Sequence, residues 1–248
     1  MFCWRKRVGL RAGDWRNGPD ITPAPLVLAG LTFLADPSGA LFHEGEGALL
    51  VADLHLEKGS SFARRGMMLP PYDTGATLTA LAAVIARYAP RIVVALGDSF
   101  HDPQAATRLS DANRGALAAL QKGREWLWLA GNHDPLPPDN LSGTVLTEWR
   151  FGPLLLRHQP QIDAGTGEIA GHLHPVARVL GTSGVARRRC FVSDGLRCIM
   201  PAFGAYAGGL NIHHPAFRSL FGKAPRIAHA LGRDRVYAVP VSRCIAGG

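Results

Sequence analysis

Residues 48–55, Ala-Leu-Leu-Val-Ala-Asp-Leu-His, decide the fold of this chain. The first five are all apolar, which predicts a strand that is buried on both faces, as in the parallel sheets of α/β proteins. Asp53 and His55 follow at once, where the strand ends. In open α/β sheets ligands bind at the carboxyl ends of the strands. The segment therefore predicts an α/β fold with a functional site after this strand.

The same succession of an apolar run and a polar cluster occurs twice more. Residues 91–96 and 126–130 are apolar enough to form buried strands. Polar clusters follow them directly, at residues 97–102 and 131–134. We expect these clusters to meet the first one at the same edge of the sheet.

Helices are predicted between these strands. Apolar residues recur at helical spacing over Asp73–Tyr88, with Asp73 and Thr74 as candidate caps and Pro90 after the end. Ala105–Lys122 is the second predicted helix, and a glycine follows it. This part of the chain is thus a βαβαβ unit.

The rest of the chain is predicted to be mostly β. After Pro135 short β-type runs are separated by Gly and Pro. The fold class is therefore α/β, and a layered sandwich is favoured over an all-parallel doubly wound sheet. The further predicted strands are Leu26–Leu34, Ala40–His43, Val145–Phe151, Leu154–Arg157, Val176–Leu180, Cys190–Val192, Arg197–Met200 and Val236–Val239.

The length and composition fit one large globular domain. The chain has 248 residues, of which 47% are apolar and 19% charged, enough to bury a core. We expect one domain over residues 23–248, preceded by a basic tail over residues 1–22. The longest apolar run, Val27–Ala35, is far shorter than the ~20 residues of a membrane-spanning helix. The amino terminus lacks the apolar region of a signal peptide, so the expected location is the cytoplasm.

Net charge and cysteine content say less about the class of protein than length and composition do. The net charge of +8 suggests an anionic partner, although a solvated basic surface explains it equally well. The four cysteines form no CxxC pair, which argues against a zinc knuckle or a disulfide framework and favours buried apolar roles. Trp126 and Trp128 alternate in a predicted strand and are expected in the core.

The polar clusters carry the chemistry of a metal site. Asp53 and His55 are two residues apart, so in an extended segment they point the same way and can hold one ion; His172 and His174 repeat this device. Carboxylate, imidazole and amide donors without thiolate suit Mn²⁺, Fe or Zn²⁺. Any one of these histidines alone is more often structural, but their joint occurrence after predicted strands favours ligands. Seven donors suffice for two ions, as in catalysts of displacement at phosphorus. Besides Asp53, His55, His172 and His174, the donors are Asp98, Asn132 and His158.

Together the clusters form five blocks: DLH at 53–55, GDSFHD at 97–102, GNHD at 131–134, a lone His158, and GHLH at 171–174. This series resembles the signature of the calcineurin-like metallophosphoesterases. Residues 51–63, 171–175 and 201–211 are also similar to one branch, the bacterial DNA-ligase-associated metallophosphoesterases. The resemblance implies a layered sandwich of two mixed sheets flanked by helices.

The resemblance also implies a role for each residue of the blocks. Asp98 would bridge the two ions, and a bridging hydroxide would attack phosphorus in line. His133 would be the general acid, oriented by Asp134. Asp102 is expected to support the site or cap a helix rather than to bind metal. Asp53, His55 and His174 would hold one ion, and Asn132, His158 and His172 the other.

Other residues near the blocks are candidates for binding substrate. Lys58, Arg64 and Arg65 follow the first block and can reach flanking phosphates, and Arg157 precedes His158. A solvated loop explains the first three equally well. Residues 203–211 contain three glycines and are interpreted either as a loop that frames the site or as a turn that needs positive φ.

We expect a phosphodiesterase that uses two divalent ions, Mn²⁺ first, with Fe and Zn²⁺ as alternatives. The resemblance implies that it cleaves DNA as an endonuclease in repair, beside an ATP-dependent DNA ligase, a helicase and a second nuclease. No membrane partner is expected. The alternative is a small-molecule phosphodiesterase acting on a nucleotide or nucleotide sugar. A non-catalytic scaffold is disfavoured, because every ligand position and the acid histidine are filled.

Overall fold

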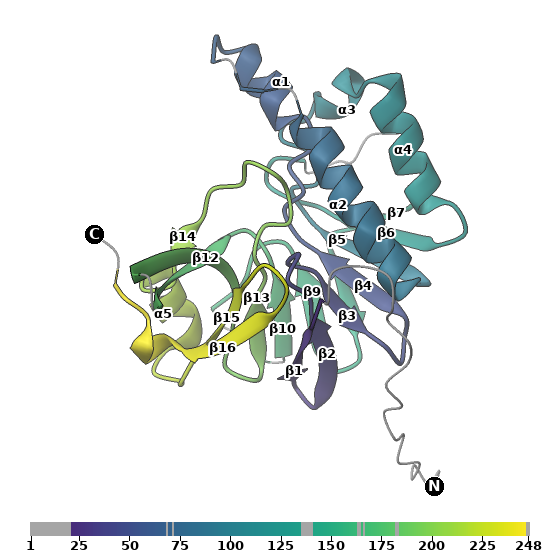
Figure 1. The fold of residues 1–248 in the computed structure, drawn as a ribbon. Helices are drawn as coiled ribbons and strands as arrows, with labels where there is room; N and C mark the ends of the chain where they lie inside the picture. Colours follow the sequence, from purple (N-terminus) through teal and green to yellow (C-terminus); the bar gives the residue numbers. More distant parts are fainter. Residues whose placement is uncertain are drawn as a thin grey trace, which may run out of the picture.

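The structure, a computed structural model, describes residues 21–67, 69–70, 72–134, 141–162, 165, 167–181 and 184–246 (Figure 1). The basic tail expected over residues 1–22 lies outside these ranges, apart from its last two residues. No helix in the described ranges is long and apolar enough to cross a membrane.

The first sheet has seven strands that lie side by side in chain order. They are β1 (Ala24–Leu28), β2 (Leu31–Ala35), β3 (Leu41–His43), β4 (Ala48–Val51), β5 (Ile92–Leu96), β6 (Glu125–Leu129) and β7 (Thr144–Leu146). Neighbouring strands from β1 to β4 are antiparallel, and those from β4 to β7 are parallel. The central strands β4 and β5 are almost wholly buried because both of their faces are covered.

Four helices lie on the outer side of this sheet (Figure 1). They are α1 (Lys58–Ala63), α2 (Asp73–Tyr88), α3 (Ala105–Arg108) and α4 (Asp111–Gln121). Helices α2, α3 and α4 pack in the apolar cluster of the sheet, and α1 packs on α2 and α3. The buried stripe of α2, which includes Leu78 and Leu81, packs with Leu49 and Val51 of β4 in one apolar cluster. Trp126 and Trp128 are in the same core, 2% and 1% exposed, as predicted.

The second sheet has nine strands in the order β14-β11-β12-β13-β10-β9-β8, and β15 and β16 extend it from β12. It is also mixed, since β10 pairs in parallel with β9 and β13 while β12 pairs antiparallel with β11, β13 and β15. The strands are β8 (Glu148–Phe151), β9 (Leu154–Arg157), β10 (Gly167–Ala170), β11 (Pro175–Gly181), β12 (Gly184–Ser193), β13 (Arg197–Ile199), β14 (Leu210–Asn211), β15 (Ile227–Leu231) and β16 (Val236–Pro240).

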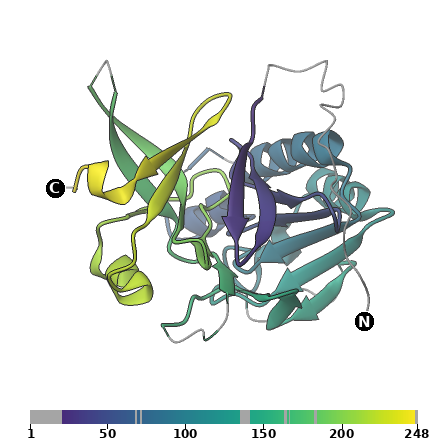
Figure 2. The same ribbon diagram turned by 90° about the horizontal axis from the view of Figure 1, so that it is seen from below.

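The two sheets pack face to face (Figure 2). Leu50 and Leu96 of the first sheet share a buried cluster with Leu156, Ile169 and Phe191 of the second. A third cluster lies behind the second sheet, where α5 (Pro215–Phe221) packs. The order of layers is thus helices, sheet, sheet, helix. The predicted sandwich of two mixed sheets flanked by helices is confirmed.

Several predicted elements are interrupted by turns. Leu26–Leu34 is not one strand but the hairpin β1–β2, because Ala29 and Gly30 both have positive φ. Ala105–Lys122 is two helices, because Leu109 leaves the helical region and the Ser110 side chain then caps α4. Val145–Phe151 is divided in the same way between β7 and β8. The sequence analysis missed α1, α5, β10, β14 and β15.

The candidate caps of α2 serve a different purpose. The helix begins at Asp73 as predicted, but the carboxylate of Asp73 accepts the N–H of Gly59 at 2.9 Å. The hydroxyl of Thr74 accepts the N–H of Glu57 at 2.8 Å and donates to the Glu57 carboxylate at 3.0 Å. These buried bonds fix α1, just after the first block, against α2.

The cysteines that the structure describes, Cys190, Cys198 and Cys244, are buried and free, as predicted. Burial raises the pKa of each thiol, so none is reactive in the way of a catalytic cysteine.

Candidate metal centre

The five blocks meet where strands of the two sheets end. Asp53 and His55 follow β4, and Asp98 follows β5. Asn132 and His158 follow β6 and β9. The last block lies between β10 and β11. The structure therefore brings together the clusters that the sequence analysis expected to meet.

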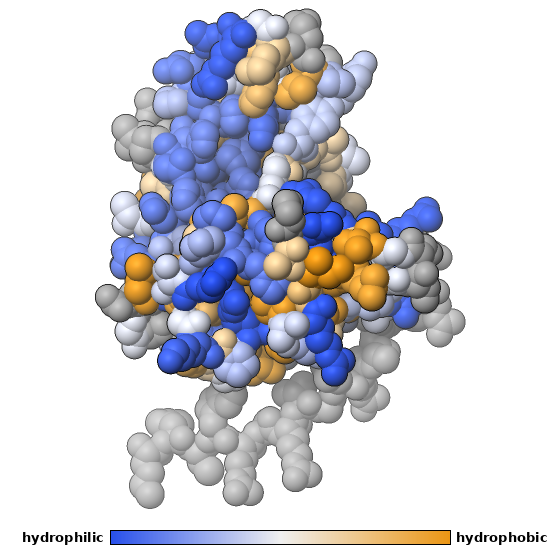
Figure 3. Space-filling view, turned by 90° about the vertical axis from the view of Figure 1, so that its left-hand side faces the viewer, coloured by the Kyte–Doolittle hydropathy of each residue, from blue (hydrophilic) through white to orange (hydrophobic). Residues whose placement is uncertain are grey.

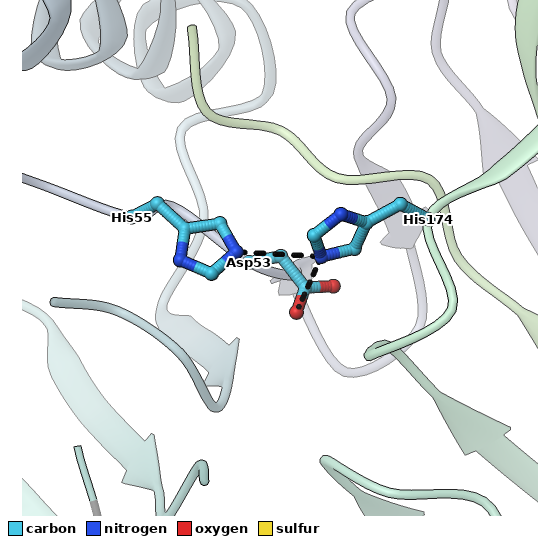
Figure 4. A group of neighbouring side chains, drawn as sticks. All are labelled: Asp53, His55 and His174. Atoms are coloured by element: carbon cyan, nitrogen blue, oxygen red, sulfur yellow. Dashed lines mark hydrogen bonds and ion pairs between the residues drawn. The ribbon is translucent and has the colours of Figure 1, made fainter. Parts of the chain in front are cut away.

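Asp53, His55 and His174 form one group (Figure 4). One donor atom from each lies within 4.8 Å of the others. Nε2 of His174 is 3.2 Å from Oδ1 of Asp53 and 3.4 Å from Nε2 of His55. Two ligand bonds of about 2.0–2.2 Å to a shared ion span up to roughly 4.4 Å, so this spacing fits one divalent ion.

Asp98, His158 and His172 form the second group, with the same spacing. The amide oxygen of Asn132 lies 2.8 Å from Nε2 of His158 and 3.0 Å from Nδ1 of His172. Nδ1 of His158 donates to the carbonyl oxygen of Leu96 at 3.0 Å, which leaves Nε2 free to bind metal. Oxygen and nitrogen donors thus surround one point, and they fit the second ion.

The carboxylate of Asp98 lies between the two groups. Oδ1 is 3.4 Å from Nε2 of His158, while Oδ2 is 4.0 Å from Nε2 of His55 in the first group. Burial raises the pKa of Asp98, but the hydrogen bond and charge of His158 outweigh burial and bring the pKa to about 2. The carboxylate is therefore ionised at neutral pH, as a bridge between two cations requires.

Each group also contains a histidine whose pKa is lowered, which favours the neutral imidazole. Burial, and then the charge of His174, lower the pKa of His55 to about 3. Burial and the charge of His158 likewise lower the pKa of His172. Neutral imidazole is the form that binds metal.

The backbone at the ligands is strained. Asp53, His55, Asp98, His172 and His174 all have φ between 45° and 69°. Left-handed conformations of residues other than glycine cost about 1–3 kcal/mol each and cluster at functional sites. The assumption of an extended segment at Asp53 and His55 was therefore wrong. The spacing argument that placed His172 and His174 on one ion was also wrong, because they belong to different groups, as the family resemblance implied.

Glycines of the blocks allow the chain segments to approach closely. A Cβ at Gly97 would lie 2.5 Å from the His158 side chain, and one at Gly171 would lie 2.5 Å from the Asp53 carboxylate. A Cβ at Gly131 would lie 2.1 Å from the backbone nitrogen of Asp98. Real Cβ atoms do not come this close, so the site needs glycine at these positions.

His133 stands at the opening of the site. Its side chain is 41% exposed, and Nε2 is 3.9 Å from Oδ2 of Asp98. Nδ1 donates to the carbonyl oxygen of His101 at 2.9 Å. The expected orientation by Asp134 was wrong: that carboxylate is buried and accepts the N–H of Phe100 at 3.0 Å. Burial raises the pKa of Asp134 to about 7.

His101 is a residue of the site that the sequence analysis missed. Its ring stacks on that of His133 with centroids 5.1 Å apart, and it lies 5.5 Å from the ring of His55. Burial, and then the charge of Lys58, lower its pKa to about 4. The signal was present in the second block, where His101 follows the bridging aspartate by three residues.

The candidate substrate contacts divide into two sets. Arg64 and Arg65 are exposed and line a hollow of about 230 Å³ with Ser61, Asp102 and Gln104. The ring of Phe62, next to Ser61 in the chain, is 5.6 Å from that of His101, and the charges of Lys58 and Arg65 act on His101. Lys58 extends over the same Phe62 ring, 5.8 Å from its centroid. The three cations after the first block therefore flank the site.

Arg157 does not point into the site. Its guanidinium pairs with Glu148 at 3.2 Å and Glu168 at 3.6 Å, and the residue is 8% exposed. Its expected contact with substrate was therefore wrong. Asp102 pairs with Arg108 at 2.6 Å and accepts the N–H of Gln104, which fits the supporting role expected of it.

The glycine-rich loop over residues 203–211 frames the first group. The N–H of Gly204 donates to the carbonyl oxygen of Asp53 at 3.2 Å, and the N–H of Leu210 donates to that of His174 at 3.1 Å. Tyr206, between them, has a φ of 59°. Both interpretations of this loop apply, because it borders the site and contains a positive φ.

Comparison with solved structures gives the same fold. The chain aligns with the Pseudomonas putida nuclease MPE at 27% identity and a TM-score of 0.67, over 88% of this chain and 100% of that one. The chain has the calcineurin-like metallophosphoesterase fold. The five-block resemblance is confirmed at this level, and with its two metal groups the chain is a metal-dependent phosphoesterase.

Two further phosphoesterase structures are more distant. YfcE, a phosphoesterase from E. coli, aligns at 14% identity with a TM-score of 0.38, over 78% of this chain and 98% of that one. A predicted phosphoesterase from Streptococcus pneumoniae aligns at 12% identity with a TM-score of 0.31, over 78% and 96%. No family model and no curated protein matches the sequence.

Proposed function

We propose that this chain is an endonuclease that hydrolyses phosphodiester bonds of DNA with two divalent ions and His133 as general acid. The observation that carries the proposal is the pair of metal groups with Asp98 between them. The likeness to a nuclease over 88% of the chain supports a nucleic acid as the substrate.

In this proposal the bound ions and His133 have different roles in catalysis. Bound ions supply an activated water and neutralise charge on the phosphoryl oxygens. His133 keeps its Nδ1 proton on the carbonyl oxygen of His101, so Nε2 is the atom that delivers a proton to the leaving oxygen. The His133 side chain is 41% exposed, so a substrate at the metals can reach it.

Mn²⁺ is the working ion in this proposal. The carboxylate, imidazole and amide donors, with no thiolate in either group, suit Mn²⁺, Fe and Zn²⁺. Fe and Zn²⁺ are the alternatives. Functional association with a ligase, a helicase and a second nuclease stays a prediction, as does a cytoplasmic location.

The position of the cations supports a polymeric substrate. Lys58, Arg64 and Arg65 lie beside the metal centre, where the phosphates next to the cleaved one would pass. A small diester has no such phosphates and would not use these residues.

The test is nicking of supercoiled plasmid by the purified protein with Mn²⁺, Mg²⁺, Zn²⁺ or EDTA. The wild type is compared with His133→Ala and with His213→Ala, a control histidine whose Nε2 binds the carbonyl of Cys244 instead of the site. We expect nicking with Mn²⁺, none with EDTA, loss of at least about 100-fold in His133→Ala, and wild-type activity in the control.

Two outcomes would contradict the proposal. An inert plasmid together with hydrolysis of bis-p-nitrophenyl phosphate would keep the metal-dependent diesterase and move the substrate to a small nucleotide or nucleotide sugar. Equal nicking by wild type and His133→Ala would remove the assigned acid.

A further inference from the structure

The basic residues of this chain are concentrated in its last third. Residues 175–248 contain eleven of the 27 Lys and Arg residues but only two of the 19 Asp and Glu residues. One of the two acids, Asp234, pairs with its neighbour Arg235, and the other, Asp194, accepts N–H groups of its own turn. This part of the chain, green to yellow, forms the left side of the molecule in Figure 1.

The β11–β12 hairpin presents two of these arginines side by side. Arg178 and Arg187 are directly opposite each other in the antiparallel register, so their side chains share one face. Like charges in this position destabilise a sheet. Among the described residues neither guanidinium forms an ion pair; the Arg187 guanidinium donates to the carbonyl oxygen of Gly209 at 3.1 Å. The arrangement therefore lacks the anion that would balance it.

This face of the hairpin is continuous with the metal centre. β11 begins directly after His174, and at about 3.3 Å per residue Arg178 is about 13 Å further along. The carbonyl oxygen of Gly209 accepts the hydrogen bond from Arg187, and the N–H of the next residue, Leu210, donates to the carbonyl oxygen of His174. On the same face Arg189 donates to the carbonyl oxygen of Ala202 at 2.7 Å. The hairpin thus packs on the loop that frames the first metal group.

An exposed apolar pair follows the arginines. Leu180 and Val185 are opposite each other, 74% and 48% exposed, where the hairpin extends from the body of the fold (Figure 2). Hydrophilic and apolar side chains are interleaved over the lower half of the side shown in Figure 3. Cationic and apolar groups on one ribbon match the phosphates and sugars of a nucleic acid strand.

We propose that the β11–β12 hairpin is an arm that holds the DNA strand beside the cleaved phosphodiester, with Arg178 and Arg187 on its phosphates. The inference rests on the proposed function, and it identifies the surface by which the protein would bind a long strand in preference to a small diester. One phosphate of the strand on each guanidinium balances the two charges. A small diester at the metals is too short to reach across about 13 Å. The arm therefore favours polynucleotides over small diesters.

The test compares two double variants that each lose two positive charges. Arg178→Gln/Arg187→Gln removes the arm's cations. Arg91→Gln/Lys122→Gln is the control, since both residues are exposed at the opposite, amino-terminal ends of β5 and β6. Plasmid cleavage and bis-p-nitrophenyl phosphate hydrolysis are measured with Mn²⁺, and binding of an uncleavable phosphorothioate duplex is measured at several salt concentrations.

We expect the arm variant to raise the KM for DNA about tenfold with unchanged kcat, and to reduce the slope of log K against log salt by about 1.8, or 0.9 for each lost phosphate contact. Hydrolysis of the small diester should be unchanged, which also shows that the variant is folded. The control should match wild type. Arg178→Lys/Arg187→Lys keeps the charge and should keep the salt slope.

Equal KM and salt slope in the two Gln variants, with DNA still cleaved, would overturn the arm and leave the proposed function intact. Loss of small-diester hydrolysis in the arm variant would also overturn it, because the hairpin would then act on the metal centre. A wild type that hydrolyses the small diester but not DNA would refute the proposed function itself.

Discussion

Replacing Gly131 with alanine should disable the metal centre, although it replaces none of the residues expected to bind metal. The new Cβ would lie 2.1 Å from the Asp98 nitrogen, 2.3 Å from its Oδ1 and 2.5 Å from Oδ1 of Asp134. Ordinary contacts are 3.4–4 Å, so either residue 131 or Asp98 must move by about 1 Å. A misplacement of this size in a catalytic site costs about 100-fold in rate.

The assay is the hydrolysis of bis-p-nitrophenyl phosphate as a function of Mn²⁺ concentration. We expect kcat/KM to fall by about 100-fold and the Mn²⁺ dependence to shift to higher concentration. The matched control is Gly115→Ala in α4, where a Cβ meets nothing within 4 Å. That variant should keep full activity and gain about 0.5–1 kcal/mol of stability. Wild-type kinetics in Gly131→Ala would refute the idea that close approach at this glycine positions Asp98.

Three further predictions concern stability. Glu168→Gln should destabilise the fold by about 3 kcal/mol in urea unfolding, because the carboxylate is fully buried between Arg157 and Arg197; a loss below about 1 kcal/mol would mean that the pair is not needed. Asp102 has its pKa held at about 2 by the hydrogen bond from Arg108, so the stability this pair provides is complete above the ordinary value of 3.8 and is lost as pH falls through 2. The stability difference between wild type and Arg108→Ala should therefore be constant at neutral pH and shrink from pH 4 to 2, and a difference that persists at pH 2 would contradict this. Finally, Mn²⁺ at 100 times its Kd should raise the free energy of unfolding by about 2.7 kcal/mol for each site, and EDTA should reverse the gain; an unchanged Tm would mean that no ion binds the folded chain.

The elements that the sequence predicted best are those in which the spacing of apolar residues is regular over the whole element. The helix over Asp73–Tyr88 and the strand Leu154–Arg157 have the predicted bounds, because apolar spacing and flanking residues define both. The hairpin β1–β2 was read as one strand, since the turn at Ala29 and Gly30 interrupts an apolar run without a usual turn pair. β15 was missed because its burial comes from pairing with β12 and β16.

The candidate site shows the same division. Residue types and positions after strands predicted which side chains would meet. The spacing of His172 and His174 suggested one shared ion, because it does not reveal the left-handed backbone at both residues. The family resemblance assigned them to different ions, and the two groups agree with that assignment. Residue types and positions also did not show that Arg157 faces Glu148 and Glu168, since strand alternation turns it away from its neighbour in the site. His101 escaped attention because its role depends on stacking with a residue 32 positions away.

The most direct test of the binuclear centre is an anomalous diffraction map of crystals soaked in Mn²⁺. The structure predicts two peaks for each chain, one among Asp53, His55 and His174 and the other among Asp98, His158 and His172. The Asp98 carboxylate should lie between the peaks, which two-metal sites place about 3.5–4 Å apart. A single peak, or peaks away from these side chains, would contradict the account.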